Sequence, residues 1–164
     1  MRPVPEVPAP GQESVWDYPR PPRVEEFGAT ITIELGGETI AVAKRSWRVL
    51  ETSHPPTYYL PRSAFEDGVL RPARGSSWCE WKGQASYFDL VTSTTTAAGA
   101  AWTYRKPTAG FTVIADAIAV MAADVDRCTV NGELVTPQPG GFYGGWVTSA
   151  VVGPFKGIPG SMGW

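Results

Sequence analysis

The stretch Ala29-Thr-Ile-Thr-Ile-Glu-Leu35, Gly36-Gly37, Glu38-Thr-Ile-Ala-Val-Ala43 decides the fold. Apolar and polar side chains alternate on both sides of the Gly-Gly pair, and this period of two is that of a strand with one buried face. Two glycines can adopt the positive φ angles that a tight hairpin turn requires. The stretch therefore predicts an antiparallel β-hairpin within a mainly β fold.

Further short strands are expected on both sides of this hairpin. They are rich in β-branched and aromatic residues and are bounded by Gly and Pro. The segment 76–90, which contains Lys82-Gly83, is expected to form two strands or one bulged strand, and 92–99 is expected to be a loop. The other predicted strands cover residues 45–50, 57–60 and 101–104, and Cys128-Thr-Val, Asn131-Gly132, Glu133-Leu-Val predicts a second hairpin.

One helix is predicted from about Thr108. Apolar residues recur at the spacing of a helix with one buried face. These residues are Phe111, Ile114, Ala115, Ile118, Met121 and Ala122. The predicted class is therefore mainly β with one helix (α+β).

The chain of 164 residues is long enough to bury the core of one domain. Seven prolines in residues 1–23 exclude a helix or central strand there and predict an extended arm. Trp16 and Tyr18 are too apolar for a solvated tail, so we expect the arm to pack on the domain. The core domain is expected to span 24–139, and 140–164 form a Gly- and aromatic-rich C-terminal extension.

The net charge of −2 provides no basic field for nucleic acid or anionic lipid, so we expect neither partner. The longest apolar stretch, 111–123, is interrupted by Asp116 and is too short to span a bilayer. With no secretory signal in the first residues, we expect a cytoplasmic protein. Its two cysteines, Cys79 and Cys128, are then expected as thiols, although a disulfide stays open. A homo-oligomer also stays open.

Three segments carry a family resemblance: Arg48-Val-Leu-Glu-Thr-Ser-His-Pro-Pro-Thr-Tyr-Tyr-Leu-Pro, Cys79-Glu-Trp-Lys-Gly-Gln-Ala-Ser-Tyr and Ala101-Trp-Thr-Tyr-Arg-Lys-Pro. Over about residues 30–135 the chain resembles the bacterial family known as domain of unknown function (DUF) 427. The resemblance implies a β-tent architecture, shared with methionine sulfoxide reductase B and the ligand-binding domain of cereblon, and carries a nucleotidyltransferase-like label. The chain departs from the family pattern at Met121-Ala-Ala-Asp-Val-Asp, where an aromatic run is usual.

Candidate site residues cluster in these three segments. Glu51 and His54, the only histidine, could act as an acid–base pair, or His54 could cap the turn before Pro55. Lys82 before Gly83 could meet an anionic group, or could be a surface lysine beside a bulge. The candidate catalytic residues are Glu51, His54 and Lys82, and the candidate ligand-binding residues are His54, Tyr58, Lys82, Tyr87, Trp102 and Tyr104.

Aromatic residues add a second kind of candidate. Trp47, Trp81, Trp102 and Tyr104 could form a cage for a planar or cationic molecule, although any single one more often belongs to the core. Alternation along a strand places Cys79 and Lys82 on opposite faces, so the Cys79 thiol is expected to be a small buried hydrophobe.

The sequence favours a module that binds an unknown small molecule. The alternatives are an enzyme acting on nucleotides and a protein-interaction domain that uses the Pro-rich arm and the aromatic tail. No cofactor is expected. Because the chain has no Cys-x-x-Cys pair, no zinc site is expected. Asp124, Asp126 and the loop 153–160 are not specific enough to predict a magnesium–phosphate site.

Overall fold

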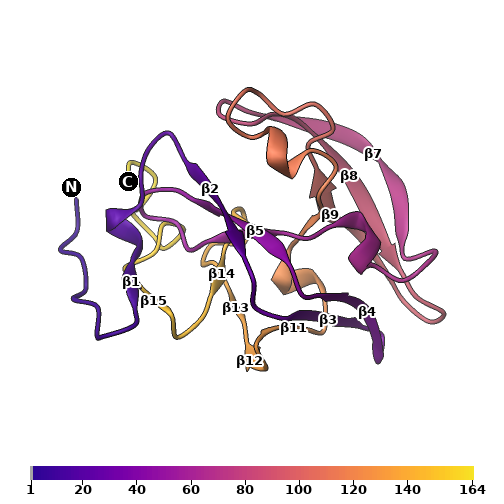
Figure 1. Cartoon of the computed structure of the whole chain (residues 1–164). Coiled ribbons are helices and arrows are strands. Elements are labelled where there is room, and N and C mark those ends of the chain that lie inside the picture. The colour runs from indigo at the N-terminus through magenta and orange to yellow at the C-terminus, as the bar shows by residue number, and fades with distance from the viewer. Residues whose placement is uncertain (1) are drawn as a thin grey trace.

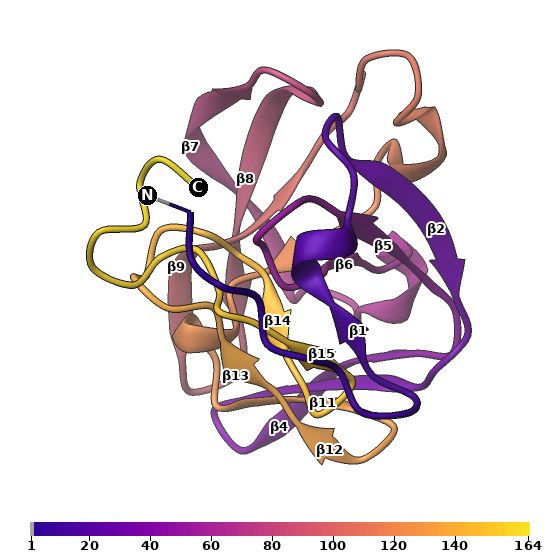
Figure 2. The same cartoon turned by 90° about the vertical axis from the view of Figure 1, so that its left-hand side faces the viewer.

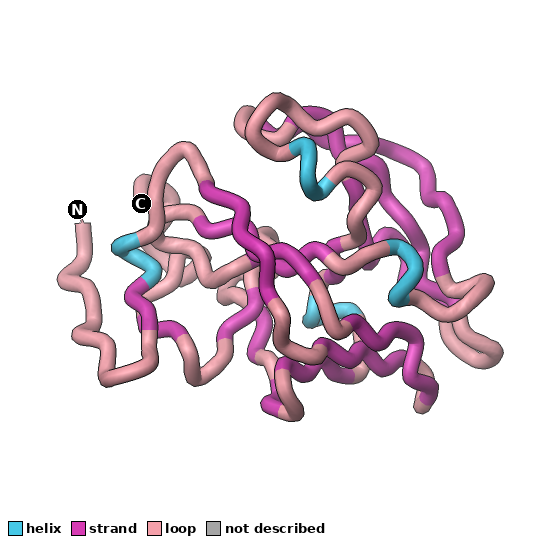
Figure 3. Tube along the Cα trace, viewed as in Figure 1, coloured by secondary structure: helices cyan, strands magenta, loops and turns pink. Residues whose placement is uncertain are grey.

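The computed structural model describes residues 2–164 and is built from short β-strands (Figures 1 and 3). The predicted mainly β class is confirmed. All helical pieces in the described chain are short 3-10 turns: η1 (Val15–Asp17), η2 (Arg62–Ala64), η3 (Thr112–Ile114) and η4 (Ala122–Asp124). In residues 2–164 no helix has the length and apolar character needed to cross a membrane.

In residues 2–164, fifteen strands fall into five sheets, and all strand pairings except that of β1 with β15 are antiparallel. The strands are β1 (Glu13–Ser14), β2 (Arg23–Phe27), β3 (Ile31–Leu35), β4 (Glu38–Ala43), β5 (Ser46–Leu50), β6 (Thr57–Tyr59), β7 (Leu70–Cys79), β8 (Gly83–Val91), β9 (Thr96–Thr103), β10 (Ala119–Val120), β11 (Arg127–Val130), β12 (Glu133–Leu134), β13 (Thr136–Pro137), β14 (Trp146–Val147) and β15 (Val151–Val152).

Two four-stranded sheets enclose the main core. Their strand orders are β10-β9-β8-β7 and β12-β11-β3-β4, and a third sheet, β2-β5-β6, runs diagonally between them (Figure 1). Apolar side chains from all three sheets meet in one cluster, which includes Ile33, Leu60, Phe88 and Trp146. Burial of these large side chains is the main source of stability.

Both predicted hairpins are present. The β3–β4 turn has Gly36 and Gly37 at φ 60° and 77°, and the β11–β12 turn has Asn131 and Gly132 at φ 48° and 81°. Two successive positive φ angles give the right-handed twist that a two-residue hairpin needs. In β3 the alternation predicted from sequence places Ile31 and its period-two neighbours in the core.

The predicted helix over 108–122 is wrong. The segment holds only the short turns η3 and η4 and the strand β10, which pairs with β9. Ile114 and Ile118 are buried as their spacing indicated, but Ile118 bridges to Leu60 and Asp116 has a φ of 61°, which no α-helix accommodates. The segment is rich in β-branched residues, whose helix propensity is low, so tertiary pairing prevails.

The segment 76–90 forms two strands, β7 and β8, joined by a turn at 80–82. The expected loop 92–99 is shorter than predicted, because β9 already begins at Thr96 and pairs with Val91. Small residues such as Ala and Gly resemble loop composition, and only the pairing with β8 identifies them as strand.

The Pro-rich arm lies along the C-terminal segment (Figure 2). Strand β1 pairs with β15 in parallel, and Val15, Trp16 and Tyr18 are buried against Leu50 and Val151. The arm is also held by charge. Buried Arg48 donates hydrogen bonds to Glu13 of β1 at 3.0 Å and to Glu25 of β2 at 2.9 Å.

Candidate functional site

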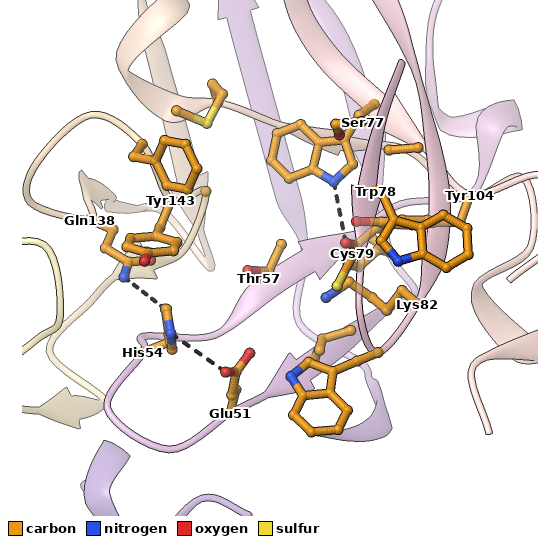
Figure 4. Close-up of a pocket in the computed structure, with 18 of the residues that line it drawn as sticks. Glu51, His54, Thr57, Ser77, Trp78, Cys79, Lys82, Tyr104, Gln138 and Tyr143 are labelled. Atoms are coloured by element: carbon orange, nitrogen blue, oxygen red, sulfur yellow. Dashed lines mark hydrogen bonds and ion pairs between the residues drawn. The ribbon is translucent and has the colours of Figure 1, made fainter. Parts of the chain in front are cut away.

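An open cavity of about 670 Å³ lies between three parts of the chain. We call one side the sheet wall, formed by Cys79, Lys82, Tyr87, Trp102 and Tyr104. The opposite side is the tail wall, formed by Gln138, Phe142, Tyr143 and Lys156. Between them lies the loop side, formed by Glu51, His54, Thr57 and Tyr59. Figure 4 shows Thr57 between the tail-wall residues Gln138 and Tyr143 and the sheet-wall residues Cys79 and Tyr104.

All of the predicted site residues line this cavity except Tyr58. Tyr58 is 3% exposed and packs between Phe27 and Trp146, with ring centroids 5.3 Å and 5.1 Å away. Successive residues of a strand point to opposite faces, so Thr57 and Tyr59 face the cavity and Tyr58 faces the core. Trp47 of the suggested aromatic cage does not line the cavity either.

The Glu51 carboxylate is paired outside the cavity. Arg20 Nε lies 3.3 Å from Glu51 Oε2, and His54 Nε2 lies 3.7 Å from the same oxygen. The Arg20 guanidinium therefore offsets the negative charge that Glu51 brings to the site. The longer contact to His54 is an ion pair only when the imidazole is protonated.

The hydrogen bonds of Gln138 fix the tautomer of His54. Gln138 is 3% exposed, its Oε1 accepts from the Gly145 amide at 3.0 Å, and its Nε2 donates to the Lys156 carbonyl at 2.9 Å. These two partners determine which end of the amide is nitrogen. Gln138 Nε2 lies 3.0 Å from His54 Nδ1, so Nδ1 accepts a hydrogen bond and the neutral ring carries its proton on Nε2.

Burial, and after it the positive charges of Lys156, Arg20 and Lys82, lower the pKa of His54 to about 4. The imidazole is therefore neutral at pH 7 and its contact with Glu51 is not a salt bridge. The proton of the neutral ring stays on Nε2, 3.7 Å from Glu51 Oε2 and beyond hydrogen-bond distance.

Two half-buried lysines reach the cavity from opposite walls. Lys82 Nζ lies 5.7 Å from the centroid of the Tyr104 ring, and Lys156 Nζ lies 5.6 Å from that of Tyr143. Lys156 Nζ also donates to the Trp164 main-chain oxygen at 3.1 Å. Among residues 2–164, no Asp or Glu side chain forms a salt bridge with either ammonium group.

The sheet wall is aromatic, and its Tyr104 is buried together with Tyr59 of the loop side. Trp102 Nε1 donates to the Tyr59 hydroxyl at 3.3 Å, and burial raises the pKa of both Tyr59 and Tyr104 well above the usual range. Both hydroxyls therefore stay protonated at neutral pH. The expectation that Cys79 is buried is wrong, because it is half-buried and lines the cavity. Cys79 ends β7 beside the 80–82 turn, where the strand no longer covers its thiol.

Both cysteines are free thiols. Cys128 is buried in the main core, and burial raises its pKa to about 12. Within residues 2–164, no cluster of three or more His, Cys, Asp or Glu side chains is arranged to hold a metal ion. Asp124 is exposed at the edge of the cavity, and Asp126 accepts a hydrogen bond from the Gly37 amide at 3.2 Å.

The tail wall has little signature in the sequence. Lys156 belongs to the glycine-rich segment 153–160, where the lysine was the only visible signal. Gln138 and Tyr143 lie in segments without hydrophobic periodicity, so no local pattern indicated that they would meet His54. Their positions depend on contacts between distant parts of the chain.

One comparison with known families bears on these residues. The model of a domain of unknown function, DUF427, matches residues 23–131, more than half of the chain. The chain belongs to the DUF427 family. The DUF427 match contains the whole sheet wall and the loop side, whereas the tail wall lies beyond its end. No curated protein matches the sequence.

Proposed function

We propose that this DUF427 domain binds a small molecule in the cavity between the sheet wall and the tail wall. The observation that carries the proposal is that the cavity gathers His54, Lys82 and Trp102, which lie far apart in the sequence, around one volume of about 670 Å³. Ligand sites are usually concave, largely apolar or aromatic, and supplied with a few convergent polar groups. Their volumes are typically about 300–1,000 Å³.

Binding is better supported than acid–base chemistry on nucleotides. A general base needs a free lone pair facing its substrate. The lone pair of His54 Nδ1 is occupied by Gln138, and the Glu51 carboxylate faces Arg20. The nucleotide-enzyme alternative would require both groups to change partners.

An interaction role for the arm is also less well supported. Trp16 and Tyr18, its large aromatic residues, are buried against the body of the molecule. They stabilise the fold and are not available to a partner.

The β-tent arrangement expected from the resemblance is likewise a proposal. It is supported by two four-stranded antiparallel sheets that pack through one core and diverge around the third sheet (Figure 1).

The proposal can be tested with a ligand screen and a cavity-filling variant. Thr57 lies in the middle of the cavity (Figure 4), so Thr57→Trp should fill it. Thr39→Trp makes the same change at an exposed position of β4 and serves as the control. Thermal shift is measured with nucleotides, cyclic imides and small organic anions.

We expect at least one compound to raise the Tm of the wild type and of Thr39→Trp but not that of Thr57→Trp. If no compound class shifts the Tm, or if Thr57→Trp responds as the wild type does, the proposal fails.

A further inference from the structure

We infer that the ligand carries an anionic group, a carboxylate or phosphate, held between Lys82 of the sheet wall and Lys156 of the tail wall. The inference rests on the proposed function and names the class of molecule that the same cavity takes.

The cavity has lysines on both walls. Each wall contributes one half-buried ammonium group, and in the described chain no Asp or Glu side chain neutralises either of them. The acidic residues that line the cavity do not change this balance. Glu51 is paired with Arg20, and Glu80 and Asp124 are exposed at the edge, where water screens them. Within residues 2–164, Lys82 therefore brings a positive charge without a polar partner, and Lys156 brings one whose partner is the Trp164 main-chain oxygen.

Both lysines have unused hydrogen-bond donors. An ammonium group has three N–H donors, and Lys156 uses one of them on the Trp164 main-chain oxygen. No hydrogen bond from Lys82 Nζ is present within residues 2–164. His54 Nε2 lies 3.7 Å from Glu51 Oε2, beyond hydrogen-bond distance, so the N–H that Gln138 fixes on this nitrogen is also unused. Unused donors on both walls suit a ligand rich in acceptor oxygens.

An aromatic ring on each wall lies beside the ammonium group of its lysine. Each Nζ lies within 6 Å of an aromatic ring centroid, Lys82 over Tyr104 and Lys156 over Tyr143. Cation–π attraction stabilises an ammonium group in this position. The two ammonium groups are therefore partly fixed before a ligand binds, which lowers the ordering cost of binding an anion.

The aromatic residues indicate a planar group beside the anion. Trp102 lines the sheet wall, and Trp78 and Phe142 stand at the cavity with 74% and 81% of their surfaces exposed. Large exposed aromatic side chains beside a charged cavity are suited to stacking on a flat ligand. A small aromatic carboxylate or phosphate ester meets both requirements.

The experiment uses pairs of probes that differ in charge. Benzoate is compared with benzamide, and phenyl phosphate with phenol, in binding titrations of the full chain. Because His54 is the only histidine, its imidazole NMR resonances report on the cavity without overlap. The variants are Lys82→Met and Lys156→Met, which keep an apolar stem, and the control is Lys44→Met at an exposed site away from the cavity.

We expect the anionic probes to shift the His54 resonances and to bind, whereas the neutral probes do neither. Each cavity substitution should weaken anion affinity about tenfold, which corresponds to one charge-assisted hydrogen bond, and Lys44→Met should leave it unchanged. Inorganic phosphate added as competitor should displace phenyl phosphate.

Two results would overturn the inference. If benzamide binds as tightly as benzoate and the lysine variants bind both, the site takes neutral molecules, and the proposed function stands without the anion. If no anionic probe binds or moves the His54 resonances at millimolar concentration, the anion site is absent. The Thr57→Trp screen then decides separately whether the cavity binds any small molecule.

Discussion

The two walls of the cavity are built on different principles. The sheet wall projects from β7, β8, β9 and the short segments at their ends, where ladder hydrogen bonds fix every second side chain on one face. The tail wall has little regular structure and is held by individual contacts, such as those of Gln138 with Gly145 and Lys156. The sheet wall tolerates local change because many ladder hydrogen bonds hold it in place. The tail wall depends on a few close contacts.

The DUF427 match ends between the two walls. It covers the sheet wall and the loop side, whereas Lys156 and Tyr143 of the tail wall lie beyond its last residue.

The largest expected loss of stability comes from disturbing a close backbone contact of the C-terminal tail. Gly157 has a φ of 119°, and a Cβ at this position would lie 1.9 Å from the Pro139 carbonyl oxygen. Gly157→Ala should lower the free energy of unfolding by about 4 kcal/mol, since backbone strain and overpacking each cost about 2 kcal/mol. Urea denaturation at equilibrium measures the change.

The matched control is Gly163→Ala, in the same tail, because a Cβ at Gly163 has no atom within 4 Å. It should change stability by less than about 0.5 kcal/mol. Equal effects of the two substitutions would show that the tail is not held by backbone contact at Gly157.

A smaller effect is expected from breaking the polar contacts of each wall. Gln138→Met keeps the volume but leaves the Gly145 amide, the Lys156 carbonyl and His54 Nδ1 without their partner. At about 1 kcal/mol for each contact, it should destabilise the protein by about 3 kcal/mol. Tyr59→Phe removes only the acceptor of Trp102 Nε1 and should cost about 1 kcal/mol.

Thermal or urea unfolding of both variants tests this difference between the walls. Comparable losses in the two variants would mean that Gln138 is no more important to the tail wall than one hydroxyl is to the sheet wall.

The smallest expected effect is a change in the pKa of His54 when a positive charge is removed from either wall. Its pKa of about 4 lies below the ordinary 6.5, because burial and then Lys156, Arg20 and Lys82 disfavour the charged form. Lys156→Met should raise the His54 pKa by about half a unit, and Lys82→Met by less, since removal of a nearby positive charge favours the imidazolium. NMR titration of the single imidazole gives each pKa.

The sign of the linked stability change follows from the same pKa. The unfolded chain binds a proton at His54 near pH 6.5, whereas the folded protein binds it only near pH 4. The neutral histidine's contribution is therefore complete above pH 6.5 and is lost as pH falls toward 4. If the His54 pKa is found near 6.5 in the folded protein, or is unaffected by Lys156→Met, the positive character of the cavity is refuted.

The same contrast explains what the sequence could predict. Alternation and turn chemistry over 29–43 and 128–135 are local, so both hairpins could be anticipated. The segment 108–122 was misassigned because apolar spacing reports burial, and a turn-rich segment can bury the same residues as a helix.

The positions of Tyr58 and Lys156 could not be predicted, for related reasons. Which tyrosine of β6 faces the cavity depends on the register of the strand. Tyr58 and Tyr59 are the same type of residue, but their side chains point to opposite faces of the strand. Lys156 reaches the site through the hydrogen bond of its amide to the Ser53 carbonyl, at 2.8 Å. Such a contact between distant segments has no signature in either segment alone.

The parallel pairing of β1 with β15 has a consequence for the order in which the site is made. Synthesis proceeds from the N-terminus, so β1 has no partner until residues 151–152 have left the ribosome. Both four-stranded sheets are complete once β12 has emerged and can form first. At that stage the tail wall has not been synthesised, so the site consists of the sheet wall and the loop side alone. The last residues to emerge therefore both pair with the N-terminal arm and complete the cavity.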